Sequence, residues 1–315
     1  MTNDPRKSDR SVVPVKPSNN AGTPAAEVVE GRDLAKGNTD QQNTLRTQRR
    51  EGVQNALDRV RQLARKDRKA KFNNLFHHLT TERLQRAFLA LKRQASAGVD
   101  NVTWDQYRAA LDVHIQDLHG RLHRGAYRAK PTRRTHIPKS DGGQRALGIA
   151  SLEDKIVQRA VVEILNAVYE SDFVGFSYGF RPGRGPHDAL DALSAGIRRR
   201  KVNWVLDADI RAYFDSIDHD WLLKFVEHRI TDKRMLRLIQ KWLSAGTVEE
   251  GRWTESTEGT PQGATVSPLL ANIYLHYVFD LWARRWRDRC ALGDVVFVRY
   301  ADDRAPRRRR EEAVM

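Results

Sequence analysis

The chain has 315 residues, of which 55 are Lys or Arg and 40 are Asp or Glu, so its formal net charge is +15. This charge favours an acidic macromolecular partner, most commonly a nucleic acid, over a surface that is basic only for solubility. The single cysteine, Cys290, excludes an intramolecular disulfide and a cysteine-based zinc site. The sequence contains no signal-peptide core and no long apolar run, which predicts a cytoplasmic protein without a membrane partner.

The N-terminal part is predicted to be disordered at first and then helical. Residues 1–45 are rich in Asn, Thr, Gln, Pro and Gly and poor in apolar side chains, which indicates disorder. Residues 46–125 have helical patterns, first in a basic stretch from Thr47 to Ala70 and then in an amphipathic one from Phe72 to Gln94. Thr103 is a candidate N-cap for a further helix that ends near Arg121.

A hairpin is predicted next, because two extended segments flank a turn. The segment from Lys130 to Lys139 is basic and extended, residues 140–143 form a Gly-containing turn, and residues 144–149 return as a strand. Ser151 or Asp154 is the expected start of a helix that continues to about Tyr169.

Helices and short strands are predicted for the rest of the chain. A Gly- and Pro-rich loop over residues 177–185 leads to a helix from Pro186 to Arg200. In chain order, the later patterns predict a strand over 204–210, helices over 219–229 and 232–244, a polar hairpin over 247–258, a turn over 259–263, a long helix from Ser267 to Arg287 and a strand over 295–299.

Acidic residues end two of these predicted strands. Asp207 and Asp209 share one face of the first strand because side chains alternate, and Asp302 and Asp303 follow the second strand. Acidic side chains are rarely buried unless they are paired or bound to a metal. Two such strand ends side by side would form an all-oxygen site for Mg²⁺, as two-metal phosphoryl transfer requires. The alternative for Asp207 and Asp209 is that both cap the helix that follows.

A series of short motifs occurs in a fixed order between residues 80 and 303. They are Ile137-Pro138-Lys139, Arg145 with Leu147-Gly148-Ile149, Asp154 to Gln158, Ser177 to Pro182, Asp207 to Asp218, Thr260-Pro261-Gln262-Gly263 and Tyr300-Ala301-Asp302-Asp303. This order resembles the N-terminal part of a group II intron-encoded reverse transcriptase/maturase. Residues 97–100 resemble an extra segment that retroviral enzymes lack; retrons and diversity-generating elements are more distant alternatives. The resemblance implies an α+β fold with right-hand polymerase fingers and an incomplete palm over residues 126–303, after a mostly helical N-terminal extension.

The resemblance also implies a metal site. Asp209, Asp302 and Asp303 are then the catalytic residues, and together with Ile210 they form a site for two Mg²⁺ ions, with Mn²⁺ as an alternative. The ten His residues show no metal-ligand spacing.

By the same resemblance, Lys139 and Arg145 hold the triphosphate of an incoming dNTP, and Arg suits bidentate phosphate contact. Phe214 abuts the sugar and excludes a 2′-hydroxyl. Gln262 completes this dNTP-binding set, and Gly263 allows the backbone to approach the template–primer pair closely.

Arg181 has two equal assignments, a nucleic-acid phosphate contact or a structural ion pair.

The function that the resemblance implies is RNA-directed DNA synthesis. An enzyme of this class adds dNTPs to a primer 3′-hydroxyl, takes intron RNA as template and a DNA primer as partners, and supports intron splicing and mobility in a bacterial-type cytoplasm. The alternative is a non-catalytic remnant that binds intron RNA. Residues 304–315 lack a strand pattern. We interpret them as an aberrant basic tail, from a shifted reading frame or a premature end, and expect weak or absent activity; a genuine nucleic-acid-binding tail is the alternative.

Overall fold

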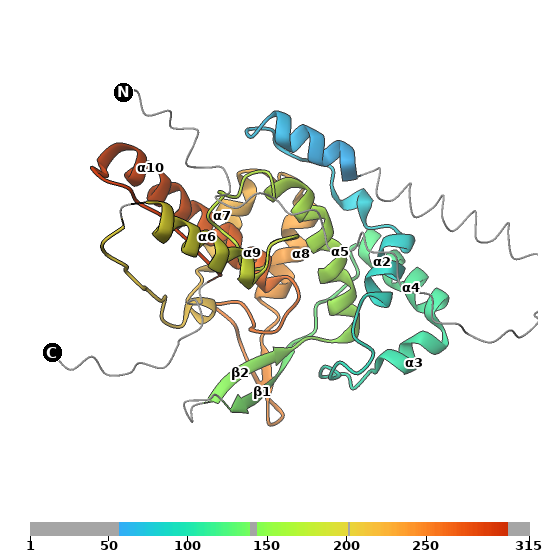
Figure 1. The fold of residues 1–315 in the computed structure, drawn as a ribbon. Helices are drawn as coiled ribbons and strands as arrows, with labels where there is room; N and C mark the ends of the chain where they lie inside the picture. The colour runs from blue at the N-terminus through green and yellow to red at the C-terminus, as the bar shows by residue number, and fades with distance from the viewer. Residues whose placement is uncertain (1–56, 139–143, 201, 302–315) are drawn as a thin grey trace, which may run out of the picture.

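The computed structural model describes residues 57–138, 144–200 and 202–301 (Figure 1). The predicted disordered segment 1–45, Lys139, the Asp302–Asp303 pair and the predicted basic tail therefore lie outside the described residues.

The helices are η2 Phe76–His78, α2 Thr81–Leu89, α3 Trp104–Ala109, α4 Leu111–His123, α5 Leu152–Tyr169, α6 Pro186–Arg199, η3 Tyr213–Asp215, α7 His219–Glu227, α8 Lys233–Leu243, α9 Ser267–Leu275, the π segment η4 His276–Asp280 and α10 Leu281–Cys290. The strands are β1 Thr132–Pro138, β2 Gln144–Ile149, β3 Thr247–Glu249 and β4 Arg252–Thr254. The α+β prediction is confirmed.

The described N-terminal part, from residue 57 on, is helical as predicted, but its helices end earlier than expected or are divided. Residues 57–66 form a helix, and the stretch predicted from Phe72 contributes only η2 and α2. Thr103 caps α3 through a reciprocal box with Gln106. The single helix expected after Thr103 is divided at Ala110, whose φ of −131° does not fit a helix.

The hairpin β1–β2 is confirmed, and it lies at one end of a four-stranded sheet with the order β2-β1-β3-β4. In its antiparallel register Arg133 pairs with Ile149 and Ile137 with Arg145. β1 also pairs in parallel with β3 at two positions, so the hairpin β3–β4 extends the sheet. Figure 1 shows β1 and β2 projecting from the helical body of the protein.

Helix α5 lies at the centre of the main hydrophobic core. Ser151 is its N-cap and accepts a hydrogen bond from the backbone N–H of Asp154, so the first of the two predicted starts is correct. Residues on several of its faces, including Ile156, Ile164 and Leu165, are fully buried. Each such side chain contributes roughly 1.5–3 kcal/mol through burial.

The two strands that were expected to end in aspartates are not formed. Residues 202–210 have no regular secondary structure, and Trp204 and Leu206 are each 91% exposed. Residues 294–298 are also irregular, and within the described chain the second segment pairs with Ser177 through a single bridge at Arg299. An apolar run forms a strand only when a neighbouring strand accepts its backbone hydrogen bonds. The described sheet, β2-β1-β3-β4, offers neither segment such a ladder.

The long helix predicted from Ser267 is present, but it has three parts. It begins at Ser267, as predicted, and Val266 is the N-cap. The helix passes through the π segment His276–Asp280 and continues as α10. Within the described ranges, no helix is both long and apolar enough to span a membrane.

Candidate active site

The turn Thr260–Gly263 joins Phe214 to β2, the strand that holds Arg145. The backbone N–H of Thr260 donates a 2.7 Å hydrogen bond to the carbonyl of Phe214. On its other side the carbonyl of Gln262 accepts a 2.6 Å bond from the backbone N–H of Gly148 on β2. A Cβ on Gly263, whose φ is +106°, would lie 3.1 Å from the carbonyl oxygen of Gly148. Only glycine fits this contact without strain.

Arg145 lies on the strand that this turn contacts. It is exposed, lies three residues before Gly148, and is opposite Ile137 in the hairpin register. Within the described residues its side chain forms no hydrogen bond, ion pair or ring contact with Phe214 or Gln262. Its predicted partner Lys139 lies outside the described part of the chain.

Phe214 is half-buried in the short helix η3. The residue before η3, Ala212, has a left-handed φ of 50°. Tyr213 anchors the turn, because its hydroxyl donates a 2.6 Å hydrogen bond to the carbonyl of Ala271 on α9. The Phe214 ring meets the Phe180 ring edge to face, with centroids 6.5 Å apart. The aromatic residue predicted to select the sugar is therefore held from both sides.

The chain next to Phe180 contacts the last described residue of the Tyr300-Ala301-Asp302-Asp303 motif. A Cβ on Gly179 would overlap the backbone of Ala301, so the two chains are in close contact. Arg299 fixes this junction: its backbone N–H donates to the carbonyl of Phe176 at 2.9 Å, and its own carbonyl accepts from Tyr178 at 2.8 Å. The segment 176–180 therefore connects Ala301 to Phe214.

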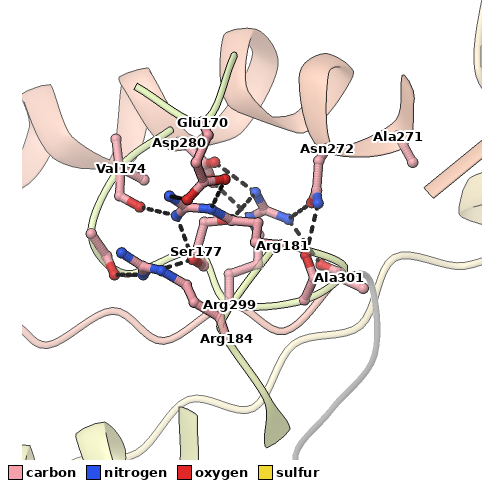
Figure 2. Close-up of polar contacts among 12 residues, drawn as sticks. Glu170, Val174, Ser177, Arg181, Arg184, Ala271, Asn272, Asp280, Arg299 and Ala301 are labelled. Carbon is pink, nitrogen blue, oxygen red and sulfur yellow. Dashed lines mark hydrogen bonds and ion pairs between the residues drawn. The ribbon is translucent and has the colours of Figure 1, made fainter. Parts of the chain in front are cut away.

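Sequence reasoning did not identify the buried polar group around Arg299 (Figure 2). Its guanidinium donates two hydrogen bonds of 2.7 Å to the Asp280 carboxylate, one of 3.0 Å to Oδ1 of Asn272 and one of 2.6 Å to the Ser177 hydroxyl. Asp280 is completely buried, which raises the pKa of its carboxyl group, and the charge of Arg299 opposes this rise. Two features of the sequence could have indicated this group: Arg299 lies in a predicted apolar strand, and Asp280 lies in an otherwise apolar part of a predicted helix.

Arg181 is engaged inside the protein. Its guanidinium forms a two-point ion pair with Glu170 at 2.6 and 3.1 Å and donates to the carbonyls of Val174 and Ser177. The residue is 6% exposed. Of its two assignments, the structure favours the ion pair over the nucleic-acid contact.

Of the four predicted metal ligands, Asp209 and Ile210 lie within the described residues. Asp207, Asp209 and Ile210 lie on the exposed, irregular segment 202–210, and Figure 1 shows this segment as a loop that leaves α6 and returns towards η3. Asp302 and Asp303 lie beyond the last described residue. Within the part of the chain that the structure describes, no three His, Cys, Asp or Glu side chains cluster as metal ligands would.

Known proteins resemble this chain over most of the region just described. The family model "Reverse transcriptase (RNA-dependent DNA polymerase)" matches residues 137–306. Protein YkfC of Escherichia coli is 40% identical over 61% of this chain and 51% of its own length. The group II intron-encoded protein LtrA of Lactococcus lactis is 34% identical over 70% of this chain and 37% of its own length. A solved partial Cas6-RT-Cas1--Cas2 complex matches 64% of this chain and 34% of that chain, with 20% identity and a TM-score of 0.43.

The chain spans about half the length of YkfC and a smaller share of LtrA. The resemblance stated from the motifs is confirmed, since a group II intron-encoded protein is among these relatives. The family model covers more than half of the residues, and the chain belongs to the reverse transcriptase (RNA-dependent DNA polymerase) family.

Proposed function

We propose that this chain is an RNA-directed DNA polymerase of the group II intron type, which adds dNTPs to a primer 3′-hydroxyl on an intron RNA template. The observation that carries the proposal is the continuous set of contacts from β2 through the turn Thr260–Gly263 to Phe214, Phe180 and Ala301. The excess of positive charge supports a nucleic-acid partner. We also propose that the protein acts in the cytoplasm, in association with intron RNA.

In this proposal Arg145 binds the triphosphate and Phe214 closes the space next to the 2′ position of the sugar. Lys139 adds a second positive charge to the triphosphate site. The backbone of Gln262 holds β2 next to the nucleotide. The hydrogen bond between Gln262 and Gly148 supports this role. Gly263 gives the template–primer pair room to approach the turn.

The carboxylates of Asp209, Asp302 and Asp303 and the main chain of Ile210 would hold divalent cations. An all-oxygen donor set of this kind suits Mg²⁺, and Mn²⁺ less specifically. When bound, two Mg²⁺ ions would favour the deprotonated primer hydroxyl and neutralise charge that develops on the triphosphate. Asp209 lies on the exposed segment 202–210, which leads into η3 and Phe214.

The test is primer extension by the 315-residue chain on poly(rA)/oligo(dT) with Mg²⁺, together with an RNA gel shift. Mg²⁺-dependent incorporation of dTTP that Asp302→Ala abolishes would support the polymerase. RNA binding without Asp302-dependent incorporation would support the second candidate, a non-catalytic protein that binds intron RNA. The observation that favours the non-catalytic candidate is the exposed position of Asp209.

A further inference from the structure

The buried group formed by Arg299, Asp280, Asn272 and Ser177, here named the Arg299 clamp, joins three segments of the chain: the loop at Ser177, the long helix that holds Asn272 and Asp280, and the segment at Arg299. Arg299 and Ser177 are 122 positions apart, and Arg299 is 27 positions from Asn272. Every member is at most 8% exposed. Four of the guanidinium's hydrogen bonds go to side chains and one, at 3.3 Å, goes to the carbonyl of Ala301.

The π segment of the long helix explains how Asn272 and Asp280 reach the same guanidinium. Side chains eight positions apart on an α-helix differ in direction by about 80°, because each residue turns the helix by about 100°. A π turn inserts one extra residue and rotates the following residues back by about 100°, which leaves a difference of about 20°. The π segment His276–Asp280 begins after Asn272 and ends at Asp280. The irregular helix therefore serves the clamp.

The Asn272 side chain binds both segments that meet at Ala301: the one that contains Gly179 and the one that contains Arg299. Its Oδ1 accepts from Arg299 at 3.0 Å, and its Nδ2 donates a 2.7 Å hydrogen bond to the carbonyl of Gly179. Gly179 in turn lies against Ala301. One side chain thus fixes the distance between the segment 176–180 and Ala301, as Figure 2 shows for the bonds around Asn272 and Arg299.

Ala301 is held in an uncommon conformation. Its φ is 54°, in the left-handed region that alanine rarely adopts, and it is 5% exposed. Such a conformation persists only where the surroundings determine it, and it often marks a functional site. Consecutive Cα atoms are about 3.8 Å apart across a trans peptide, so a fixed Ala301 limits the positions open to Asp302.

We propose that the Arg299 clamp is a positioning device for the carboxylate pair that follows it: Arg299, oriented by Asp280 and Asn272, sets the backbone of Ala301 so that Asp302 and Asp303 can bind divalent cations. The inference rests on the proposed function and deepens it, because it assigns positioning roles to three residues, Asn272, Asp280 and Arg299. These residues act through the backbone and contact no substrate.

A buried ion pair alone does not require such a role, so the test includes a matched pair elsewhere. Arg229 and Asp172 form a buried ion pair at 2.7 Å, and Arg229 also donates to the carbonyl of Arg68. That pair anchors the N-terminal helical part rather than Ala301. Arg229→Lys is therefore the control for loss of buried arginine geometry. Asn272→Ala is the second test variant, because it leaves the Arg299–Asp280 pair in place. It keeps the inference testable if Arg299→Lys does not fold.

The first readout is the Mg²⁺ concentration that gives half-maximal primer extension, with thermal midpoint and RNA affinity measured beside it. Residues that orient metal ligands change metal affinity or activity by about 10- to 100-fold when they are replaced. We expect Arg299→Lys and Asn272→Ala to raise the half-saturating Mg²⁺ concentration at least about tenfold. RNA affinity should stay within about twofold, because the variants leave the exposed basic residues in place. Arg229→Lys should lower the thermal midpoint without changing the Mg²⁺ requirement.

The second readout does not depend on synthesis. Fe²⁺ with ascorbate and hydrogen peroxide cleaves the backbone next to a bound metal, and we expect cleavage near Asp302 that Asn272→Ala reduces and Arg229→Lys leaves intact. Equal Mg²⁺ requirement and equal cleavage in Asn272→Ala and the unmodified chain would overturn the inference. If the unmodified chain neither extends a primer nor is cleaved near Asp302, the proposed function fails, and the inference fails with it.

Discussion

The backbone N–H of Thr260 lies 2.7 Å from the carbonyl oxygen of Phe214, and this hydrogen bond ties the turn Thr260–Gly263 to the candidate nucleotide site. The residue before it, Gly259, makes the bond possible. Its φ is +80°, and a Cβ there would lie 2.8 Å from the carbonyl oxygen of Asp215. Glycine at this position is therefore required by both conformation and space.

We predict that Gly259→Ala destabilises the protein by about 2 kcal/mol or more, because it adds steric overlap to left-handed strain. The KM for dNTPs should also rise, since the turn would move away from Phe214. Gly251→Ala is the matched control: its φ is +78°, but no atom lies within 4 Å of the added Cβ. Urea denaturation and steady-state kinetics measure the two effects. Equal losses of stability in the two variants would contradict the role given to the Asp215 contact.

Phe214 gives a second prediction, about the choice of sugar. Phe214→Val should raise the ratio of kcat/KM for UTP to that for dTTP by at least about tenfold, the order that steric discrimination in a pocket supplies. The valine side chain would leave room for a 2′-hydroxyl that the ring excludes. Phe225→Val on α7 removes an aromatic ring that stacks on Tyr277 instead, so it controls for the loss of a ring. Unchanged sugar selectivity in Phe214→Val would remove the residue from the nucleotide site.

Arg145 gives a third prediction, about the triphosphate. Arg145→Ala should raise the KM for dNTPs about tenfold or more, because a hydrogen bond to a charged group contributes about 1.5–3 kcal/mol. Its exposure predicts a change in stability within about 0.5 kcal/mol. Arg134→Ala on β1 is the control, since Arg134 is also exposed and lies 3.6 Å from Glu249. A parallel loss of RNA affinity and dNTP binding in Arg145→Ala would indicate an RNA contact instead.

The local elements of this fold were predictable because their signals lie close together in the sequence. Thr103 and Ser151 cap helices with side chains three residues from the groups they bind. Two extended segments on either side of the Gly-containing stretch 140–143 were enough to predict the hairpin, and the antiparallel pairing of β1 and β2 confirms it. The family motifs added the residues of the candidate site, and in the structure the turn Thr260–Gly263 contacts Phe214 through Thr260 and β2 through Gln262 and Gly263.

The strands and the Arg299 clamp depend on partners that no local pattern specifies. The apolar run around Trp204 and Leu206 matches a buried strand in composition, but the described sheet gives it no ladder and its side chains are exposed. Arg299 pairs with Asp280 and Ser177 across large separations in sequence, so neither partner could be inferred from spacing. The π segment that aligns Asp280 has no established sequence signal.

The last prediction concerns His276, which links the clamp to the pH dependence of stability. The imidazole is 4% exposed, and its Nδ1 has no hydrogen-bond partner among the residues that the structure describes. Burial lowers its pKa from 6.5 to about 3, and the nearby positive charge of Arg299 contributes in the same direction. Between these two pH values the unfolded chain binds a proton that the folded chain does not.

The stabilisation that His276 gives is therefore complete above pH 6.5 and is lost as the pH falls towards 3, with a slope of at most about 1.4 kcal/mol per pH unit. We expect His276→Leu to remove this part of the acid dependence, so that its free energy of unfolding falls less between pH 7 and pH 4. At pH 7 the cost of the substitution should be below about 2 kcal/mol, because the volume of the side chain is nearly conserved. His78, whose pKa burial lowers to about 4, is present in both proteins and cancels in the comparison. Urea denaturation at a series of pH values measures the slopes, and His187→Leu, at an exposed position, controls for loss of a histidine. Parallel curves for His276→Leu and the unmodified chain would show that the imidazole is solvated or protonated in the folded protein.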